Sequence, residues 1–389
     1  MPVVVFVLAV AVFAQGTSEF MVSGLLAEIA ADVGVSLGAA GLLTSLFAAG
    51  MVFGAPVMAM AVGRLPVRYS AAAFLLLFSV AHVVGAVTDG FAVLLVTRVV
   101  AAVANAGFLA IVLAALPGLV GPALLGRATS VVVSGVTVAC IAGVPAGTVL
   151  GQACGWRSAF WAVAVLSALV LVPVWVLLGD AGESSGARTS LRKEWAVLGD
   201  GGLRTAVAAG ILVNAATFGA FTYLGAITSG VAAGGLWVAL VLALFGAGSF
   251  LGVTVAGRVS DRHSQRIIVG GSVALVVVWL AAGLGASTLA GVLVAAVVTG
   301  AVAFGVGSTL ITTIVRTATP AAPRLGGALA TTAFNIGAVL GPVTAGLFVD
   351  RTGYPTAALW CGAVFSAVAV GVVVLGRRAG AGSEPVGVR

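Results

Sequence analysis

Charged residues are scarce in this 389-residue chain. Aspartate, glutamate, lysine and arginine together make up 7% of it, whereas about 25% is usual for a soluble domain. A water-soluble protein of this size could not cover its surface with so few charges, and a disordered chain needs high charge and low hydrophobicity. Because 61% of the residues are hydrophobic, the composition indicates a membrane protein with several spanning segments.

Residues that carry most enzyme chemistry are also few. The chain has three cysteines, an odd number that implies no disulfide framework, and their spacing is not that of metal ligands. The two histidines, His82 and His263, lie far apart, and the single lysine, Lys193, follows Arg192 rather than a P-loop glycine. The motifs HExxH and CxxC are missing. We therefore expect no metal, no cofactor and no enzymatic activity.

Long apolar runs of about 20 residues, the length that crosses a bilayer, recur along the whole chain. They show no period-two alternation, so they predict an all-α fold rather than a membrane β-barrel. The first run lacks a positive n-region and is too long for a cleavable signal, so it is interpreted as the first span. The twelve predicted helices cover residues 3–26, 39–62, 70–88, 91–115, 127–151, 158–178, 205–228, 234–257, 267–286, 288–315, 326–349 and 356–376.

A polar segment divides the predicted spans into two groups of six. The predicted organisation is an N-terminal bundle at 1–178, a cytoplasmic linker at 179–204, a C-terminal bundle at 205–378 and a cytoplasmic tail at 379–389. The two halves resemble each other, because arginines in two loops recur at an offset of 198 residues: Arg64 and Arg68 match Arg262 and Arg266. Parallel six-helix repeats around a midplane site are typical of transporters.

The basic residues predict the orientation in the cell membrane. If both termini are cytoplasmic, 15 of the 18 lysines and arginines fall on the inner side and two on the outer side, as the positive-inside rule requires. The net charge of +7 is then a topology signal. The basic residues are not clustered on one face or tail, so we expect a lipid bilayer and no nucleic acid as partner.

The fifth predicted helix carries a small residue at every fourth position, which places them on one face. Such a stripe lets another helix approach closely, and a proline within it can kink the helix. The eleventh helix repeats the pattern. The spacing alone fits ordinary tight packing, but two matched copies favour a working interface between the halves. The residues are Gly135, Ala139, Gly143, Pro145, Gly147 and Gly151, echoed by Ala333, Gly337, Gly341, Pro342 and Ala345.

Glu19 and Arg98 are the ionisable acid and base that these boundaries leave inside the bilayer. Each costs about 2.5–3.5 kcal/mol at a helix centre, so a lipid-facing position is disfavoured. The two lie at similar depth and could pair. A poorly hydrated site favours the neutral carboxylic acid, whereas a guanidinium favours the carboxylate, so Glu19 is predicted to exchange protons. A static ion pair is the alternative, but Gln15 and Asn105 extend the two polar faces and suggest a wet cavity.

Other polar and aromatic side chains in the predicted helices are weaker candidates for substrate contacts. Asn214, Phe218 and Phe221 share one face of the seventh helix, and Asn335 lies in the eleventh. Each taken singly is more often a helix–helix contact than a ligand contact.

The loop GlyArgValSerAspArgHisSerGlnArg at 257–266, with Asp261, and its counterpart at 63–68 resemble the loop signature of the major facilitator superfamily. Gly63 departs from the acidic residue usual in the first loop. The pattern of the fifth helix is similar to that of the superfamily's drug–proton antiporters. GlyThrSerGluPheMet at 16–21 and AlaAsnAlaGlyPhe at 104–108 resemble the actinomycete chloramphenicol-efflux branch.

The resemblance implies a transporter of twelve helices in two bundles. It implies export of chloramphenicol or a related small amphipathic drug by alternating access, with the proton motive force as energy source. We expect a monomer. One alternative is an exporter of a sugar or another metabolite from the same superfamily, and a remote one is a receptor or scaffold that transports nothing.

Overall fold

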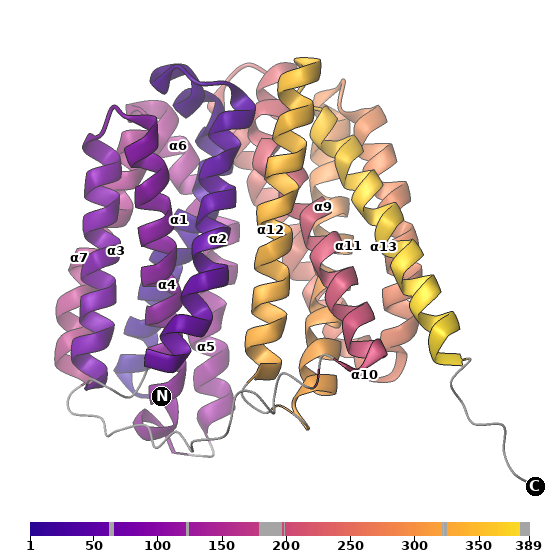
Figure 1. Cartoon of the computed structure of the whole chain (residues 1–389). Helices are drawn as coiled ribbons and strands as arrows, with labels where there is room; N and C mark the ends of the chain where they lie inside the picture. Colours follow the sequence, from indigo (N-terminus) through magenta and orange to yellow (C-terminus); the bar gives the residue numbers. More distant parts are fainter. Residues whose placement is uncertain are drawn as a thin grey trace, which may run out of the picture.

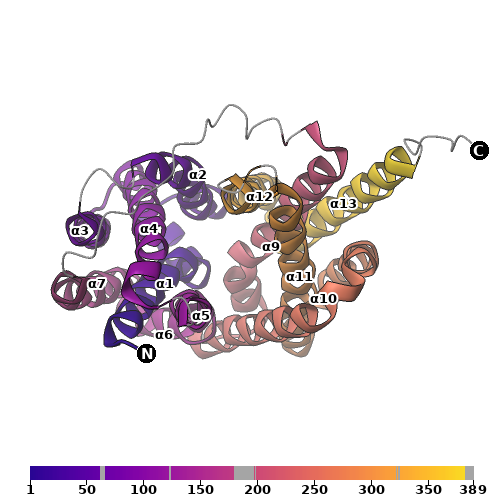
Figure 2. The same ribbon diagram turned by 90° about the horizontal axis from the view of Figure 1, so that it is seen from below.

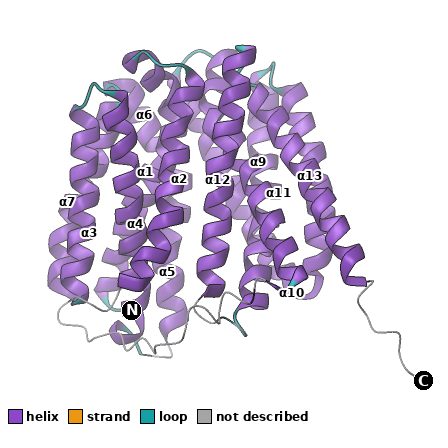
Figure 3. Cartoon of the chain, viewed as in Figure 1, coloured by secondary structure: helices purple, strands orange, loops and turns teal. Residues whose placement is uncertain are grey.

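The computed structural model describes residues 1–61, 66–121, 124–178, 197, 199–320, 322 and 325–381. Within these ranges the chain consists of helices joined by short loops and contains no strand (Figures 1 and 3), which confirms the predicted all-α class. The helices are α1 (Val3–Val33), α2 (Leu37–Ala61), α3 (Val67–Val87), α4 (Phe91–Leu119), α5 (Leu125–Val138), η2 (Ala139–Gly143), α6 (Val144–Cys154), α7 (Arg157–Leu178), α9 (Gly201–Val231), α10 (Gly235–Gly285), α11 (Leu289–Ala318), α12 (Leu325–Thr352) and α13 (Ala357–Ala381).

These elements form twelve helices that are long and apolar enough to cross a membrane within the described part of the chain. The segments α5, η2 and α6 form one continuous span, in which η2 is a single turn of π-helix. Conversely, α10 contains two spans that meet at a kink, where His263 has non-helical backbone angles. The number of spans therefore matches the sequence prediction, although the π-helical turn was not expected.

Several helices extend beyond their predicted bounds, among them the first and the seventh. The first helix continues to Val33 and ends where Gly34 adopts a left-handed conformation (φ 72°) that closes the last turn. Glu19 therefore lies at the middle of α1, roughly 21–24 Å from either end at about 1.5 Å per residue. The seventh span, α9, begins at Gly201 because Asp200 caps it, accepting a 2.6 Å bond from the amide of Leu203.

The first six spans and the last six lie side by side, and three helix pairs join them. Helix α2 packs on α12, α1 on α9, and α6 with η2 on α10, an arrangement visible along the axis of the bundle in Figure 2. We call the end where α1 begins and α13 ends the lower end, and the end with the turn Gly34–Ser36 the upper end, as drawn in Figure 1.

The buried apolar side chains show where the two halves are joined. Near the lower end, one cluster contains only residues of the first six spans, such as Leu8 and Leu116. A second cluster there contains only residues of the last six, such as Ile314. Two further clusters combine the halves: Phe20 packs with α9 and α10, and Tyr223 packs with α1 and α2. The halves thus share their cores through the middle and upper part of the molecule.

Within the C-terminal half, α10 and α11 approach each other through facing glycines. A Cβ atom on Gly252 would collide with the backbone carbonyl of Ala301, and one on Gly300 with the carbonyl of Phe245. Small residues at such crossings allow the backbones to pack closely, which is a main source of stability between helices in a membrane.

We therefore expect Gly252→Leu to lower the free energy of unfolding by about 1–3 kcal/mol, because the new side chain forces the backbones of α10 and α11 apart. Gly257→Leu is the matched control, since a Cβ there meets no atom within 4 Å. Thermal unfolding in a mild detergent measures both variants. Equal melting temperatures for the two would contradict the importance of the α10–α11 contact.

Candidate functional site

Arg98 lies inside the first six spans, with 1% of its surface exposed. Its guanidinium donates 2.8 Å and 2.9 Å hydrogen bonds to the hydroxyl and the backbone carbonyl of Ser18 in α1. The ring of Phe47 in α2 lies 4.4 Å from the guanidinium carbon, close enough for a cation–π contact. A charge buried in a membrane protein is costly unless protein groups replace its water, and these contacts from α1 and α2 do so.

His82 in α3 completes this network. Its Nε2 lies 2.5 Å from the Ser18 hydroxyl, and its Nδ1 lies 2.7 Å from the carbonyl of Phe78. The Phe78 carbonyl can only accept, so Nδ1 donates to it. When Nε2 carries no proton, the Ser18 hydroxyl accepts from Arg98 and donates to His82.

Glu19 follows Ser18 directly but takes no part in that network. Among the described side chains, none forms a hydrogen bond or an ion pair with its carboxylate, so the expected pairing with Arg98 is absent from this conformation. The reason is geometric: Arg98 is occupied by Ser18, and consecutive residues of an α-helix point about 100° apart. Glu19 is half-buried, while Ser18 and Phe20 on either side of it are buried.

The helices around α1 indicate which way the exposed part of Glu19 faces. Helix α1 is surrounded by helices of both halves, namely α2, α4, α5, α6, α7 and α9. Around the middle of such a helix, a side chain that reaches solvent-accessible space reaches the space between the halves rather than lipid. Gln15, one turn away, is 1% exposed, and both polar atoms of its amide are buried without a partner among the described residues.

A cluster of phenylalanines lies beside this position. The ring of Phe20 is 5.9 Å from that of Phe218 and 6.2 Å from that of Phe221, and Phe221 is 4.9 Å from Phe245. These rings join α1 of the first half to α9 and α10 of the second, and they line a narrow pocket between the halves together with Cys140, Thr217 and Ser249. Aromatic faces with a few hydroxyl groups suit an amphipathic molecule.

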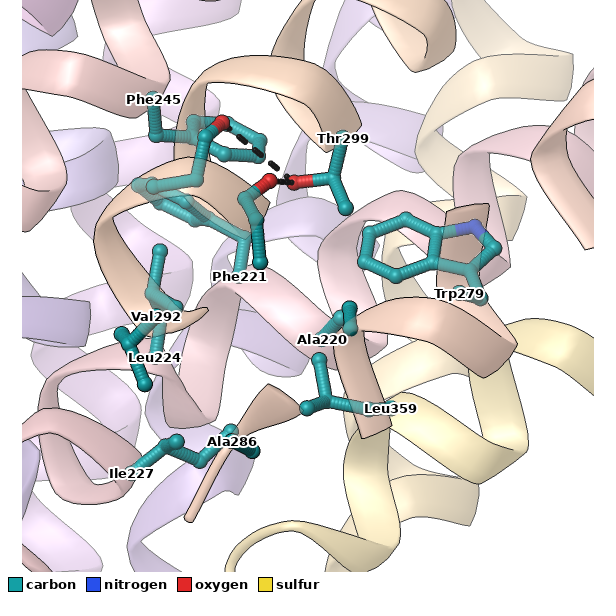
Figure 4. A pocket seen from close by; sticks show the side chains of 13 residues that line it. Ala220, Phe221, Leu224, Ile227, Phe245, Trp279, Ala286, Val292, Thr299 and Leu359 are labelled. Atoms are coloured by element: carbon teal, nitrogen blue, oxygen red, sulfur yellow. Dashed lines mark hydrogen bonds between the residues drawn. The ribbon is translucent and has the colours of Figure 1, made fainter. Parts of the chain in front are cut away.

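A second pocket continues from Phe221 and Phe245 into the C-terminal half (Figure 4). Its lining is almost wholly apolar. The hydroxyl of Thr299 bonds to the carbonyl of Ala295 in its own helix at 2.6 Å, and the indole nitrogen of Trp279 lies on the side of the ring turned away from Phe221. This pocket therefore suits a mainly apolar group, and the indole nitrogen of Trp279 is a buried donor without a partner among the described residues.

The remaining predicted contact residues have mainly structural partners. Asn214 donates a 2.5 Å bond to the carbonyl of Phe334, which ties α9 to α12, and Asn335 donates to the carbonyl of Thr331 in its own helix. Asn105 is buried in α4. The structure thus places Phe218 and Phe221 in the aromatic cluster and gives Asn214 and Asn335 helix contacts.

The glycine stripes do not form the expected interface between the halves. Cβ atoms on Gly135, Gly143, Gly147 and Gly151 would all meet α1 of the same half. In the second half, Gly337 and Gly341 likewise face α9. That expectation was wrong because α1 and α9 are the central helix of each half, and close packing is needed there. Across the halves, Gly246 of α10 instead meets the carbonyl of Cys140 in η2.

The predicted loop motif is only partly visible. Arg64 and the side chains of Asp261 and Arg262 lie outside the described residues. Arg68 stands 4.9 Å over the ring of Tyr69 and 5.4 Å over that of Trp175, and Arg266 is exposed. Both described arginines lie toward the lower end.

Sequence reasoning missed Ser18, Phe20 and His82 as parts of the site. The run GlyThrSerGluPheMet at 16–21 did contain them, but a helical face cannot say which neighbouring helix it meets. Among the described residues, no group of three or more His, Cys, Asp or Glu side chains gathers as metal ligands would.

The sequence matches the Major Facilitator Superfamily over residues 8–324, with a second match over 230–388. The chain belongs to this superfamily. It is a transporter, not an enzyme. It is 46% identical to a chloramphenicol resistance protein of Streptomyces lividans and 31% identical to the inner membrane transport protein YdhP of Escherichia coli K12, each over 95% of both chains.

The fold agrees with that assignment. A bacterial homologue of the human lysosomal transporter Spinster, solved in an inward-facing and unoccupied conformation, superposes with a TM-score of 0.81 over 96% of both chains at 16% identity. The prediction of a membrane transporter of this superfamily is therefore confirmed.

We expect Ser18→Ala to lower the melting temperature of this transporter clearly, because it leaves buried polar atoms of Arg98 and His82 without a partner, at about 1–3 kcal/mol each. Ser167→Ala is the matched control: Ser167 is fully buried, but its hydroxyl has no partner in the described structure. Thermal unfolding in detergent compares them, and a control at least as destabilised as Ser18→Ala would refute the proposed importance of the network.

Proposed function

We propose that this transporter exports chloramphenicol or a related small amphipathic antibiotic in exchange for protons, by alternating access. The observation that carries the proposal is the position of Glu19, a carboxylate without a partner at the middle of α1, facing the space between the halves and next to the aromatic cluster. The relative at 46% identity, a chloramphenicol resistance protein, supports the choice of substrate.

In this mechanism Glu19 binds and releases the transported proton. Arg98 stays fixed to Ser18 and supplies a constant positive charge near the carboxylate without neutralising it by direct contact. When Glu19 is protonated, the empty carrier can return. Inside the cell, the proton and the drug compete for the cavity, so the drug loads as the proton is released. No cofactor is required, and the membrane potential contributes about 2.3 kcal/mol per charge per 100 mV.

The separate apolar clusters at the lower end support the direction of loading. With the positive-inside orientation, that end faces the cytoplasm, so this conformation would receive drug from inside the cell. The aromatic rings of Phe20, Phe218 and Phe221 would bind the apolar part of the drug, and Gln15 and Asn105 are the polar candidates near it.

We expect Glu19→Gln to abolish proton-driven drug efflux, because the amide keeps the size of the side chain but cannot release a proton. Glu28→Gln is the control, since Glu28 lies on the same helix near its upper end. Purified protein in liposomes, with a pH gradient imposed and drug uptake followed over time, measures the effect at equal protein amounts. Accumulation by Glu19→Gln at the rate of the unmodified protein would remove Glu19 from the mechanism.

We expect Phe218→Ala to weaken drug binding about five- to tenfold, because an aromatic contact and its buried area are worth on the order of 1–1.5 kcal/mol. Phe53→Ala, which changes a ring that is 70% exposed on α2, should bind normally. Titration of each purified variant with chloramphenicol gives the affinities. Unchanged affinity in Phe218→Ala would move the binding site away from the aromatic cluster.

Energised efflux from cells tests the substrate class. Cells that produce this chain should tolerate more chloramphenicol than cells with Glu19→Gln, and an uncoupler should abolish the difference. Resistance to none of a panel of antibiotics, with export of a sugar instead, would favour the metabolite exporter. Drug binding without any flux in liposomes would favour a receptor.

A further inference from the structure

The upper end of the molecule is closed by a contact between the halves that involves Asp350, near the end of α12. Its carboxylate accepts a 2.7 Å bond from the hydroxyl of Ser36 and a 2.8 Å bond from the amide of Gly38, in the first turn of α2. Ser36 is itself the cap of α2, since its hydroxyl oxygen accepts from the amide of Ala39 at 3.0 Å. An acid of one half therefore completes the cap of a helix in the other.

Tyr223 of α9 reinforces the same corner. Its hydroxyl donates a 3.1 Å bond to the carbonyl of Pro342 in α12 and is fully enclosed. It fits between Gly41 of α2 and Gly346 of α12, where a Cβ atom on either glycine would collide with it. A Cβ on Gly38 would collide with the Asp350 carboxylate. The fit depends on glycines at these positions on both sides of the contact.

The repeat of 198 residues places Gln152, at the end of α6, where the second half has Asp350. The turns that follow correspond as well, since Gly155 and Gly353 both have positive φ, 82° and 73°. The helix that Gln152 meets is α10, which begins 198 residues after α2. Gln152 lies against Gly235 in the first turn of α10, as Asp350 lies against the first turn of α2.

The two corners nevertheless differ in chemistry. The Gln152 side-chain oxygen is buried without a partner among the described residues, and Gly234, the N-cap of α10, provides no side-chain hydrogen bond to the helix start. A polar recess opens beside it, lined in part by Glu28, Asp32 and Ser229. The residue on the helix start is thus a hydrogen-bonded acid at one corner, and at the other it is a neutral amide whose side-chain oxygen has no partner among the described residues.

We propose that Asp350 is a conformational latch, which holds the upper end closed by capping α2 across the two halves and must release α2 for that end to open. The corner between α6 and α10 lacks this restraint. The inference rests on the proposed alternation between two states, but it does not depend on the identity of the drug or on protons.

The test measures opening of the upper end directly. In a background with all three cysteines replaced, Ala345→Cys, a fully buried position of α12 beside Tyr223, reports opening through its reaction with a hydrophilic maleimide in nanodiscs, without drug or pH gradient. Asp350→Ala should raise the labelling rate three- to tenfold, because bonds to a charged acceptor at a helix start are lost. Gln152→Ala should change it less than twofold.

A second reporter separates opening from unfolding. Val132→Cys, fully buried among side chains of the first half alone, should label equally slowly in both variants. If Asp350→Ala does not fold, Ser36→Ala takes its place and should raise the labelling of Ala345→Cys by a smaller factor. Equal effects of Asp350→Ala and Gln152→Ala, or equal acceleration at Val132→Cys, would overturn the latch. If the labelling is as predicted but the unmodified protein exports no drug, that result would count only against the proposed substrate.

Discussion

The guanidinium of Arg98 is a positive charge enclosed by helices, and the arrangement of the first half follows from the need to replace its water. Ser18 supplies two oxygens, Phe47 supplies the face of an aromatic ring, and His82 orients the Ser18 hydroxyl. These four groups come from α1, α2, α3 and α4, so one buried charge ties four spans together. A network of this kind is costly to break partially, because each orphaned polar atom stays in a medium without water.

Binding of Arg98 by neutral oxygens has a consequence for Glu19. A direct ion pair would neutralise both charges and tend to hold the carboxylate in one protonation state. Here the acid is the next residue along α1 but points to a different side, toward the space shared by the halves. The charge of Arg98 therefore acts on Glu19 as a fixed field rather than as a bonded partner, and the carboxylate oxygens have no side-chain partner in the described structure, as the proposed proton exchange requires.

Much of the fold was predictable, because a span is determined by its own composition: continuous apolar runs gave twelve helices, and Glu19 and Arg98 were evident as charges within them.

What could not be predicted depends on contacts between helices. Small residues at every fourth position continue through Ala139–Gly143, so the sequence gives no sign of the π-helical turn there. The same periodicity identifies a closely packed face but not its neighbour, which is why the glycine stripe was assigned to the other half instead of to α1. Glu28 and Asp32 resembled loop residues, which concealed the length of the first helix.

The distribution of close contacts bears on how the halves could move. Each glycine stripe packs against the central helix of its own half, and this packing would be preserved in a rigid rotation of that half. Contacts between the halves include a tyrosine seated between two glycines, an aspartate on a helix start, and close crossings of Gly225 with Ser23 of α1 and of Gly246 with the π-helical turn. A π-helical turn leaves the regular hydrogen-bond ladder and often marks a functional position. The π-helical turn lies at the crossing with Gly246, just before Pro145. It gives the span a place to bend between α5 and α6 while the glycine stripe stays packed against α1.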